Sequence, residues 1–437
     1  MGIKRLVLMI PVLLLVLCPM ITAEEKIDGI ESVANIEKVE NVVNVEKDKG
    51  AAVKSVCRIA FSSKRDGNFE IYTINEDGSG LKRLTSSKND NLKPQWSPDG
   101  QKIMYLSKKG REVAIRVMND DGSGQVEIAR NCVTDYLPLW SPDSTKVLFM
   151  AKNKSKTIIC RVDADGGNLI RLTERGAEGT CPSWSADGQR ILCLEKYKRK
   201  KYIYMMNSDG TERVKVTKND DSYRMAAWSP DNSKIAYIST KMTILGSFNQ
   251  LTVMDNNGDN DMKIAEATKL RESIDYNDSF CWSPDGKMFT FTKVADVEAH
   301  VSESGAVTFD YFYGAYIVGT DGNDYDRLLG KTGSKPMLPD WSPDSSRAAV
   351  LSESKLVIYN LKTRIEDEID IKVSLPLSMV KWSPDGKKLI FAGKNHSFQK
   401  SGLYLVTLDG KVTKLSGNKD YDPVWAPIEK CEVGVEM

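Results

Sequence analysis

Few side chains in this sequence could do acid–base or nucleophilic chemistry, and they are scattered. The two histidines, His300 and His396, stand far apart in polar connections, where a lone histidine is more often solvated than catalytic. The chain has no Gly-x-Ser-x-Gly segment, the motif that presents a nucleophilic serine in α/β-hydrolases. We therefore predict no catalytic residues and no enzymatic activity.

Carboxylates are plentiful, and a recurring set of aspartates precedes glycine. Asp163-Ala164-Asp165-Gly166 and the longer run Asp255–Asp261 resemble calcium loops superficially, but such a loop needs five or six oxygen ligands and a distal carboxylate. Asp-Gly and Asn-Gly also favour tight hairpin turns, and that explanation suffices here. We predict no metal ion and no cofactor.

The sequence contains eight cysteines, with no spacing typical of a zinc site. Cys160 and Cys193 fall at positions where related segments carry Tyr, Phe or Val. A free cysteine packs well in an apolar core, so we interpret both as buried thiols.

The element that must position all of these residues is a repeat. Each of the eight tryptophans begins a copy of Trp-Ser-Pro-Asp-Gly or a variant of it, with successive spacings of 44, 44, 44, 54, 59, 41 and 43 residues. Pro presets the turn, Asp bonds its own backbone and Gly accepts a positive φ. A period near forty with a turn in each unit is typical of propeller blades.

Each unit reads as four strands. A strand ends at the tryptophan, a second follows the turn with apolar residues two apart, and a third runs into Asp-Gly or Asn-Gly in seven of the eight units, which predicts a hairpin into a fourth strand. The sequence thus predicts an all-β fold: a β-propeller of four-stranded antiparallel blades.

The two ends of the repeat are half-blades. Residues 59–85 supply the second to fourth strands of a unit without a tryptophan strand, and Pro423-Val424-Trp425 is a first strand with nothing after it. We predict that the C-terminal strand pairs with the N-terminal strands and closes an eight-bladed ring, removing exposed sheet edges. The same alignment places Cys57 and Cys431 within one position of each other, which predicts a disulfide across the closure.

The motifs resemble the TolB-like, or PD40, propellers, whose unit reads roughly P-x-W-S-P-D-G-x-x-I-A-F, then I-Y-x-M-D, D-G and L-T. Pro94-Gln95-Trp96 and Ile203-Tyr204-Met205-Met206-Asn207 follow that pattern closely, and the resemblance covers about residues 57–431. Family members commonly have six or seven blades. The resemblance implies a scaffold for partners in the cell envelope, as TolB is.

The first 56 residues differ in composition from the repeat. Residues 1–23 combine a cationic start, an apolar run and Ile21-Thr22-Ala23, which predicts a cleaved signal peptide and an exported protein of the periplasm, cell surface or exterior; an uncleaved anchor is the alternative. Residues 24–56 mix charges with Val and Ile without caps and predict a flexible tether. The propeller domain is predicted over residues 57–437.

Charge limits the class of partner. The chain has 61 Lys and Arg against 60 Asp and Glu. A nucleic-acid-binding protein needs a basic excess gathered on one face, so we predict no nucleic-acid partner. In a propeller with strands A to D from the axis outward, the D-to-A and B-to-C connections share one face, the funnel face. The former are often acidic and the latter often basic, as at Lys108, Lys154 and Lys198, which predicts either an acidic ring inside a basic one or ordinary charged loops.

We predict a binding site on the funnel face, where the chain descends toward the axis four or five residues before each tryptophan. Carboxylates, amides and tyrosines there suit a basic peptide or a sugar: Asn91, Asp135, Tyr136, Tyr223, Asn277, Asp278, Asp420 and Tyr421.

Two long B-to-C insertions, 240–250 and 293–314, cause the irregular spacings. The larger one is aromatic, and it either packs on itself or offers an exposed platform: Phe309, Tyr311, Phe312 and Tyr313.

The sequence therefore predicts an exported, monomeric, non-catalytic propeller that binds a protein, a peptide or an envelope glycan, without stable membrane insertion. A polysaccharide-degrading enzyme and a purely structural envelope protein are the alternatives.

Overall fold

The computed structural model places a propeller at residues 56–432. The described residues are 54–434 apart from these gaps: 135, 174–176, 220, 244–245, 267–279, 302–306, 334–335, 353, 372, 374, 395–400, 418 and 429–431. The predicted signal peptide, and all but the last residues of the predicted tether, lie outside this range.

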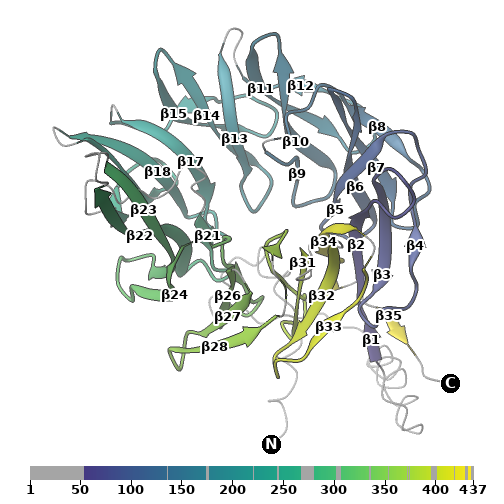
Figure 1. Cartoon of the computed structure of the whole chain (residues 1–437). Coiled ribbons are helices and arrows are strands. Elements are labelled where there is room, and N and C mark those ends of the chain that lie inside the picture. The colour runs from purple at the N-terminus through teal and green to yellow at the C-terminus, as the bar shows by residue number, and fades with distance from the viewer. Residues whose placement is uncertain are drawn as a thin grey trace, which may run out of the picture. The chain divides into compact units, whose positions relative to one another are not determined.

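Eight sheets of antiparallel strands follow one another around the ring (Figure 1). Blade 1 has β34 (Asp420–Trp425), β2 (Arg58–Ser63), β3 (Glu70–Asn75) and β4 (Lys82–Arg83). Blade 2 has β5 (Asp90–Trp96), β6 (Lys102–Lys109), β7 (Glu112–Asn119) and β8 (Val126–Ala129). Blade 3 has β9 (Leu139–Trp140), β10 (Lys146–Asn153), β11 (Lys156–Asp163) and β12 (Ile170–Arg171). Blade 4 has β13 (Glu178–Trp184), β14 (Arg190–Tyr197), β15 (Lys200–Asn207) and β16 (Val214–Lys215).

The second half of the ring repeats this order with less regular strand lengths, the longest being in blades 5 and 6. Blade 5 has β17 (Ser222–Trp228), β18 (Lys234–Thr243), β19 (Gly246–Asp255) and β20 (Met262–Glu266). Blade 6 has β21 (Phe280–Trp282), β22 (Met288–Val301), β23 (Val307–Gly319) and β24 (Asp326–Thr332). Blade 7 has β25 (Asp340–Trp341), β26 (Arg347–Ser352), β27 (Lys355–Asn360) and β28 (Ile365–Asp370). Blade 8 has a divided first strand, β29 (Leu375–Pro376) and β30 (Lys381–Trp382), which both pair with β31 (Lys388–Lys394), then β32 (Ser401–Thr407) and β33 (Val412–Lys414).

The predicted closure is confirmed. β34 pairs with β2 in antiparallel register, with Trp425 opposite Ile59 and Asp420 opposite Ser63. Blade 1 is therefore built from both ends of the chain, which leaves the ring without an open edge. Separately from the ring, β1 (Lys54–Val56) and β35 (Glu432–Gly434) form a two-stranded sheet.

The core is divided into eight clusters, one between each pair of neighbouring blades. The cluster between blades 8 and 1, for example, joins Ile390 and Leu403 to Ile59, Phe61 and Trp425. A similar cluster lies at each of the other seven boundaries. Because strand side chains alternate, each inner strand sends one face to the preceding blade and the other to the following blade.

The tryptophans also join neighbouring blades through hydrogen bonds. Trp140 Nε1 donates to the carbonyl of Gln95 at 3.4 Å and Trp425 Nε1 to that of Lys381 at 3.1 Å; Trp184, Trp341 and Trp382 do the same. In all five pairs the acceptor is the residue just before the tryptophan of the previous blade, so the motif fixes blade-to-blade geometry.

The described residues contain no helix with the length and apolar character needed to span a membrane.

Candidate functional site

The polar groups of the repeated motif form hydrogen bonds within the motif itself. In blade 2, Ser97 Oγ donates to Asp99 Oδ1 at 2.6 Å and accepts the backbone N–H of Lys102 at 2.9 Å, while the N–H of Gly100 bonds the Ser97 carbonyl at 2.8 Å. The same serine–aspartate bond recurs in blades 3 to 8. We call this edge of the ring the turn face; its aspartates stabilise turns.

The Asp-Gly turns lie on the same face and are likewise self-contained. Asp77 Oδ1 accepts the N–H and the hydroxyl of Ser79 at 2.9 and 2.6 Å, and Asp165 Oδ1 accepts the N–H of Gly167 at 2.8 Å. Within the described ranges, no three His, Cys, Asp or Glu side chains are grouped so as to hold a metal ion.

The funnel face of blade 1 holds the most deeply buried ion pair among the described residues. Asp420 is fully buried and accepts from Arg65 Nη2 at 3.0 Å, and Ser416 Oγ donates to its other oxygen. The Arg65 guanidinium lies 4.7 Å from the ring centroid of Tyr72 and 5.5 Å from that of Phe61. Asp420 therefore holds the closing strand to the B-to-C connection.

Glu70, also fully buried on this face, organises a second network. Its carboxylate accepts from Ser87 N and Asn91 Nδ2, both at 2.7 Å, and from Arg83 Nη2 at 3.1 Å. Burial alone raises the pKa of Glu70, but the hydrogen bonds from Ser87, Thr85, Asn91 and Asn68 outweigh it and hold the pKa below its usual value. Glu70 could not be predicted as a site residue from the sequence, because its position there indicates only a strand residue.

The predicted funnel-mouth residues that the structure describes are mostly internal. Asn91 and Tyr223 are only 2% and 1% exposed. The Asn91 amide donates a hydrogen bond to Glu70, and Tyr223 packs edge-on against Tyr237 with 5.4 Å between the ring centroids. Tyr421 packs on Phe69 at 5.5 Å. These side chains shape the face rather than present themselves to a ligand.

The remaining predicted funnel-mouth residues are Tyr136, Asp135, Asn277 and Asp278. Tyr136 is 43% exposed. Asp135, Asn277 and Asp278 lie outside the described residues.

In blades 4 and 5, carboxylates of the predicted acidic ring pair with lysines of the predicted basic ring. Strand A begins, and strand B ends, at the funnel face, so their terminal residues are cross-strand neighbours. Lys196 Nζ lies 3.2 Å from Glu178 Oε2, and Lys241 Nζ lies 2.5 Å from Asp221 Oδ2. The inner carboxylates are thus paired with cations of their own blade in these units.

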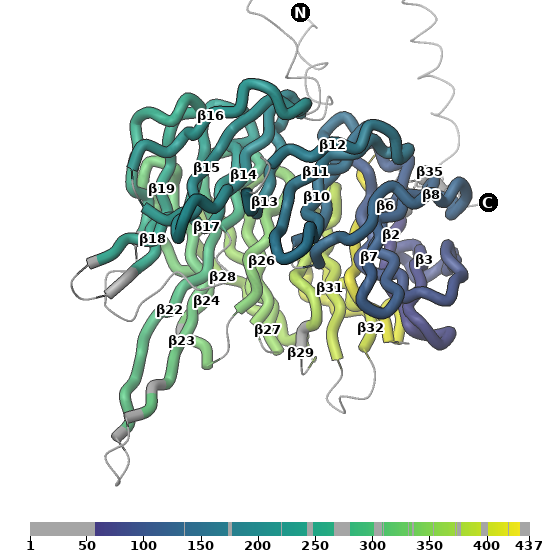
Figure 2. The backbone as a smooth tube through the Cα atoms, turned by 90° about the horizontal axis from the view of Figure 1, so that it is seen from above, coloured from purple at the N-terminus to yellow at the C-terminus, as the bar shows by residue number. Residues whose placement is uncertain are grey.

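The larger aromatic insertion is a regular β-hairpin rather than a loop. β22 and β23 stay paired from Met288 opposite Gly319 to Val301 opposite Val307, and the hairpin projects beyond the other blades (Figure 2). We call residues 294–313 the arm. The shorter insertion likewise continues the β18–β19 pairing out to Thr243 opposite Gly246.

The arm has two chemically different faces. Val297 opposes Tyr311 on one face, with Val294 opposite Tyr313 beyond a bulge, while Glu298 opposes Asp310 on the other. Tyr311 is 44% exposed. His300 Nε2 lies 2.9 Å from Asp310 Oδ2, so this histidine belongs to a surface pair.

Of the other predicted platform residues, Phe312 and Tyr313 are part-buried, and nothing is described of the Phe309 side chain. His396 lies outside the described residues.

Of the six cysteines that the structure describes, five are free thiols and one is disulfide-bonded. Cys160 and Cys193 are free and buried, as predicted, and burial raises the pKa of the Cys160 thiol to about 11. Cys57 is disulfide-bonded. Cys431 lies outside the described residues, so the Cys57–Cys431 pairing stays a prediction.

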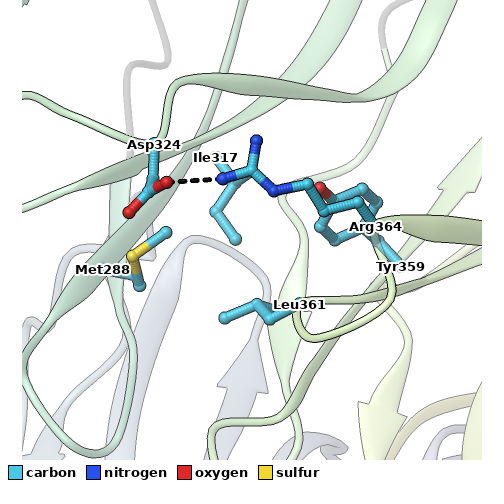
Figure 3. Close-up of a pocket in the computed structure, with 6 residues that line it drawn as sticks. All are labelled: Met288, Ile317, Asp324, Tyr359, Leu361 and Arg364. Carbon is cyan, nitrogen blue, oxygen red and sulfur yellow. Dashed lines mark hydrogen bonds and ion pairs between the residues drawn. The ribbon is translucent and has the colours of Figure 1, made fainter.

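A cavity of about 160 Å³ lies between blades 6 and 7 on the turn face (Figure 3). Met288, Ile317, Leu361 and Tyr359 line it, and Arg364 Nη2 meets Asp324 Oδ1 at 2.5 Å across it. Blade 7 lacks Asp-Gly, and its turn instead closes with the N–H of Arg364 on the Asn360 carbonyl at 2.8 Å. The cavity is smaller than a typical ligand site and follows from this irregular turn.

Comparison with known proteins agrees with the repeat. Residues 37–232 match the PD40 family, described as the TolB beta propeller domain. The matched part of the chain, a little under half of its length, is similar to that domain. Two curated relatives are both named Tol-Pal system protein TolB. That of Desulfosudis oleivorans is 48% identical over 48 residues, 11% of either chain, and that of Geobacter sulfurreducens is 44% identical over 46 residues, 10% of this chain and 11% of the relative. This chain thus spans about a tenth of either relative.

Solved structures share the propeller fold at low identity. Oligogalacturonate lyase from Vibrio parahaemolyticus is 12% identical with a TM-score of 0.51, over 83% of this chain and 100% of the other. Prolyl endopeptidases match at 12% identity and a TM-score of 0.52, over 82% of this chain and 55% of theirs. This likeness concerns the fold alone.

Proposed function

We propose that this protein is an exported, non-catalytic propeller scaffold that binds a protein partner of the cell envelope on its funnel face. Its curated relatives are named as Tol-Pal system proteins, and that name supports a protein partner. The buried carboxylates of the funnel face are engaged by Arg65, Arg83, Asn91 and Ser87, so they are poorly placed for acid–base work.

The observation that carries the proposal is the arm. Beyond Tyr313, β23 no longer pairs with β24, so the arm continues as two strands. An isolated two-stranded hairpin is only marginally stable in water, and exposed aromatic side chains are typical anchors of protein interfaces. The arm presents Tyr311 beside Val297 on one face, and a partner that covered this face would stabilise it.

Charge defines the partner further. The opposite face of the arm carries Asp296, Glu298 and Asp310, together with His300 and the part-buried Phe312. We therefore expect a partner with an apolar patch bordered by Lys or Arg, whose association slows as salt rises.

The test compares the wild-type protein and three variants as baits for envelope extract. In the first variant, residues 295–312 are replaced by Asn-Gly, which joins the paired Val294 and Tyr313 through a two-residue turn. The second is Tyr311→Ser, and the third is the opposite-face control Glu298→Gln. A photo-cross-linker at position 311 identifies the captured protein, whose affinity is then measured.

We expect the shortened arm to abolish capture and Tyr311→Ser to weaken it roughly thirtyfold, as for a tyrosine hot spot. Glu298→Gln should bind within about threefold of wild type. Unchanged capture by the shortened arm would move the site to the funnel mouth. Depolymerisation of a polysaccharide by the purified protein would instead favour an enzyme, and no partner at all would favour a structural role.

A further inference from the structure

Three consecutive blades present the same hairpin on the funnel face. Each turns through two residues: Gly110-Arg111 in blade 2, Lys154-Ser155 in blade 3 and Lys198-Arg199 in blade 4, flanked by the pairs Lys109–Glu112, Asn153–Lys156 and Tyr197–Lys200. The equivalent turns are 44 residues apart. Neighbouring blades share core clusters, so these tips form a continuous part of the rim, which we call the basic arc.

The basic arc is dense in positive charge. The acidic residues near its hairpin tips are Glu112 and Glu195, and Glu195 is buried against Arg213 at 2.7 Å. Glu178 on the neighbouring inner strand pairs with Lys196. The cations number eleven, of which all but Lys200 and Lys201 are exposed: Lys108, Lys109, Arg111, Lys152, Lys154, Lys156, Lys196, Lys198, Arg199, Lys200 and Lys201. By contrast, the arm of blade 6 is acidic, so charge is distributed unevenly around one face of a chain whose net charge is +1.

The backbone at these tips disfavours the lysines. Lys154 and Lys198 have φ of 56° and 55°, a left-handed conformation that costs a side-chain-bearing residue energy. Blade 2 has Gly110 at the equivalent position, with φ 60°, and glycine is the residue this turn position favours. Folding alone therefore does not explain a lysine at the outermost point of two hairpins, whereas binding an anion does.

Aromatic rings lie among the charges of blade 4. Tyr197 is 62% exposed with Lys198 Nζ 5.5 Å from its ring centroid, and Lys215 Nζ lies 4.8 Å from the ring of Tyr202. A tyrosine ring offers a flat apolar surface with a polar end, on which the apolar face of a sugar ring can stack while neighbouring ammonium groups meet its carboxylates.

We propose that the basic arc binds an anionic polysaccharide, a linear chain of sugars bearing carboxylates. A polymer with a regular charge spacing matches cations repeated once per blade. A membrane surface would call for several apolar side chains to insert, and Tyr197 is the one large exposed aromatic or aliphatic side chain on the described tips. This inference goes beyond the proposed function, because it uses blades 2 to 4 and not the arm.

The experiment uses the full-length chain and immobilised alginate, a linear uronate polymer, with neutral dextran, dextran sulfate and anionic phospholipid vesicles as comparison probes. Lys154→Gln/Lys198→Gln removes the two tip charges and keeps the strained turns. Lys154→Gly/Lys198→Gly removes the same charges and relieves the strain. The matched control, Lys387→Gln/Lys411→Gln, removes two exposed charges from the turn face of blade 8.

We expect alginate binding that neutral dextran does not show, and a roughly tenfold loss of affinity in both tip variants, as for two lost ionic contacts. The Gly variant alone should melt at a higher temperature, so its weaker binding cannot come from a damaged fold. The control variant and the arm-shortened protein should bind alginate like wild type, which separates this inference from the proposed function.

Three outcomes would overturn the inference. They are unchanged alginate affinity in both tip variants, equal losses in the tip and control variants, and binding to dextran sulfate or vesicles that matches or exceeds binding to alginate.

Discussion

The two faces of the ring differ in how closely successive blades resemble one another. On the turn face, Ser97 and its equivalents in blades 3 to 8 make the same bond to aspartate two residues later. On the funnel face the connections differ from one part of the ring to another: blade 1 has buried networks, blades 2 to 4 have short basic tips and blade 6 has the arm. The turn face sets the geometry of the blades, and the funnel face is free to vary in chemistry.

This difference shows why repeated carboxylates are poor functional markers here. Asp99 and its equivalents recur because each one accepts bonds from its own turn, such as the N–H of Gln101 at 3.0 Å. The informative carboxylates are Glu70 and Asp420, which are buried and occur once each.

The largest effect should come from Asp420 on the funnel face. Asp420→Asn leaves Arg65, whose side chain is 12% exposed, without its counter-charge. Removing one partner of a buried pair costs about 3–5 kcal/mol of unfolding free energy, which urea denaturation measures. The variant is therefore a test of folding rather than a clean probe of the predicted funnel-mouth site.

A double variant provides the control for Asp420. Arg65→Met together with Asp420→Asn removes both charges, so it should recover part of the loss. A double variant as unstable as the sum of the two single variants would contradict the coupling of these residues.

The next largest effect should come from Glu70→Gln, which replaces an acceptor of several hydrogen bonds with a group that donates. We expect a loss of about 2 kcal/mol at neutral pH. Because the folded-state pKa of Glu70 is lowered, its contribution is present above the unfolded-state pKa and is lost as pH falls through the folded-state value. Urea titrations at about pH 7 and about pH 3 should show the difference shrinking in acid. If the difference in unfolding free energy between the variant and wild type stayed constant, the charge of Glu70 would not contribute to stability.

On the turn face, the same substitution should have the same effect wherever it is made. Ser185 of blade 4 and Ser342 of blade 7 each donate to aspartate at 2.6 Å and accept a backbone N–H at 2.9 Å. We expect Ser→Ala at either to cost about 1–2 kcal/mol, with the two values agreeing within about 0.5 kcal/mol. A much smaller cost at Ser342 would show that the irregular turn of blade 7 weakens its neighbour.

The sequence was sufficient for the turn face and insufficient for the funnel face, for a physical reason. The Trp-Ser-Pro-Asp-Gly motif encodes local bonds between residues two to five apart, so the strands, the eight blades and the closure through β34 could all be predicted. The burial of Asn91 and Tyr223 depends on neighbours 14 or more residues away, such as Glu70 and Tyr237, and no local pattern records it. The aromatic composition of the arm is evident from the sequence, but which residues share a face depends on the register of β22 and β23.

The smallest effect should be a gain, at Asp422 on the inner strand of blade 1. Burial raises the pKa of Asp422, against the attraction of Lys93 and the hydrogen bond from Ser62 Oγ at 3.3 Å. A raised folded-state pKa means that the folded protein binds the proton more tightly, so stability falls as pH rises between the unfolded- and folded-state values. Asp422→Asn removes that penalty and suits the positive φ of 51° at this position. The variant should be more stable than wild type at neutral pH and equal to it in acid, where the carboxyl is protonated in both states. Lower stability at neutral pH would mean that the attraction of Lys93 outweighs burial, and the funnel face would then contain a further ion pair that contributes to stability.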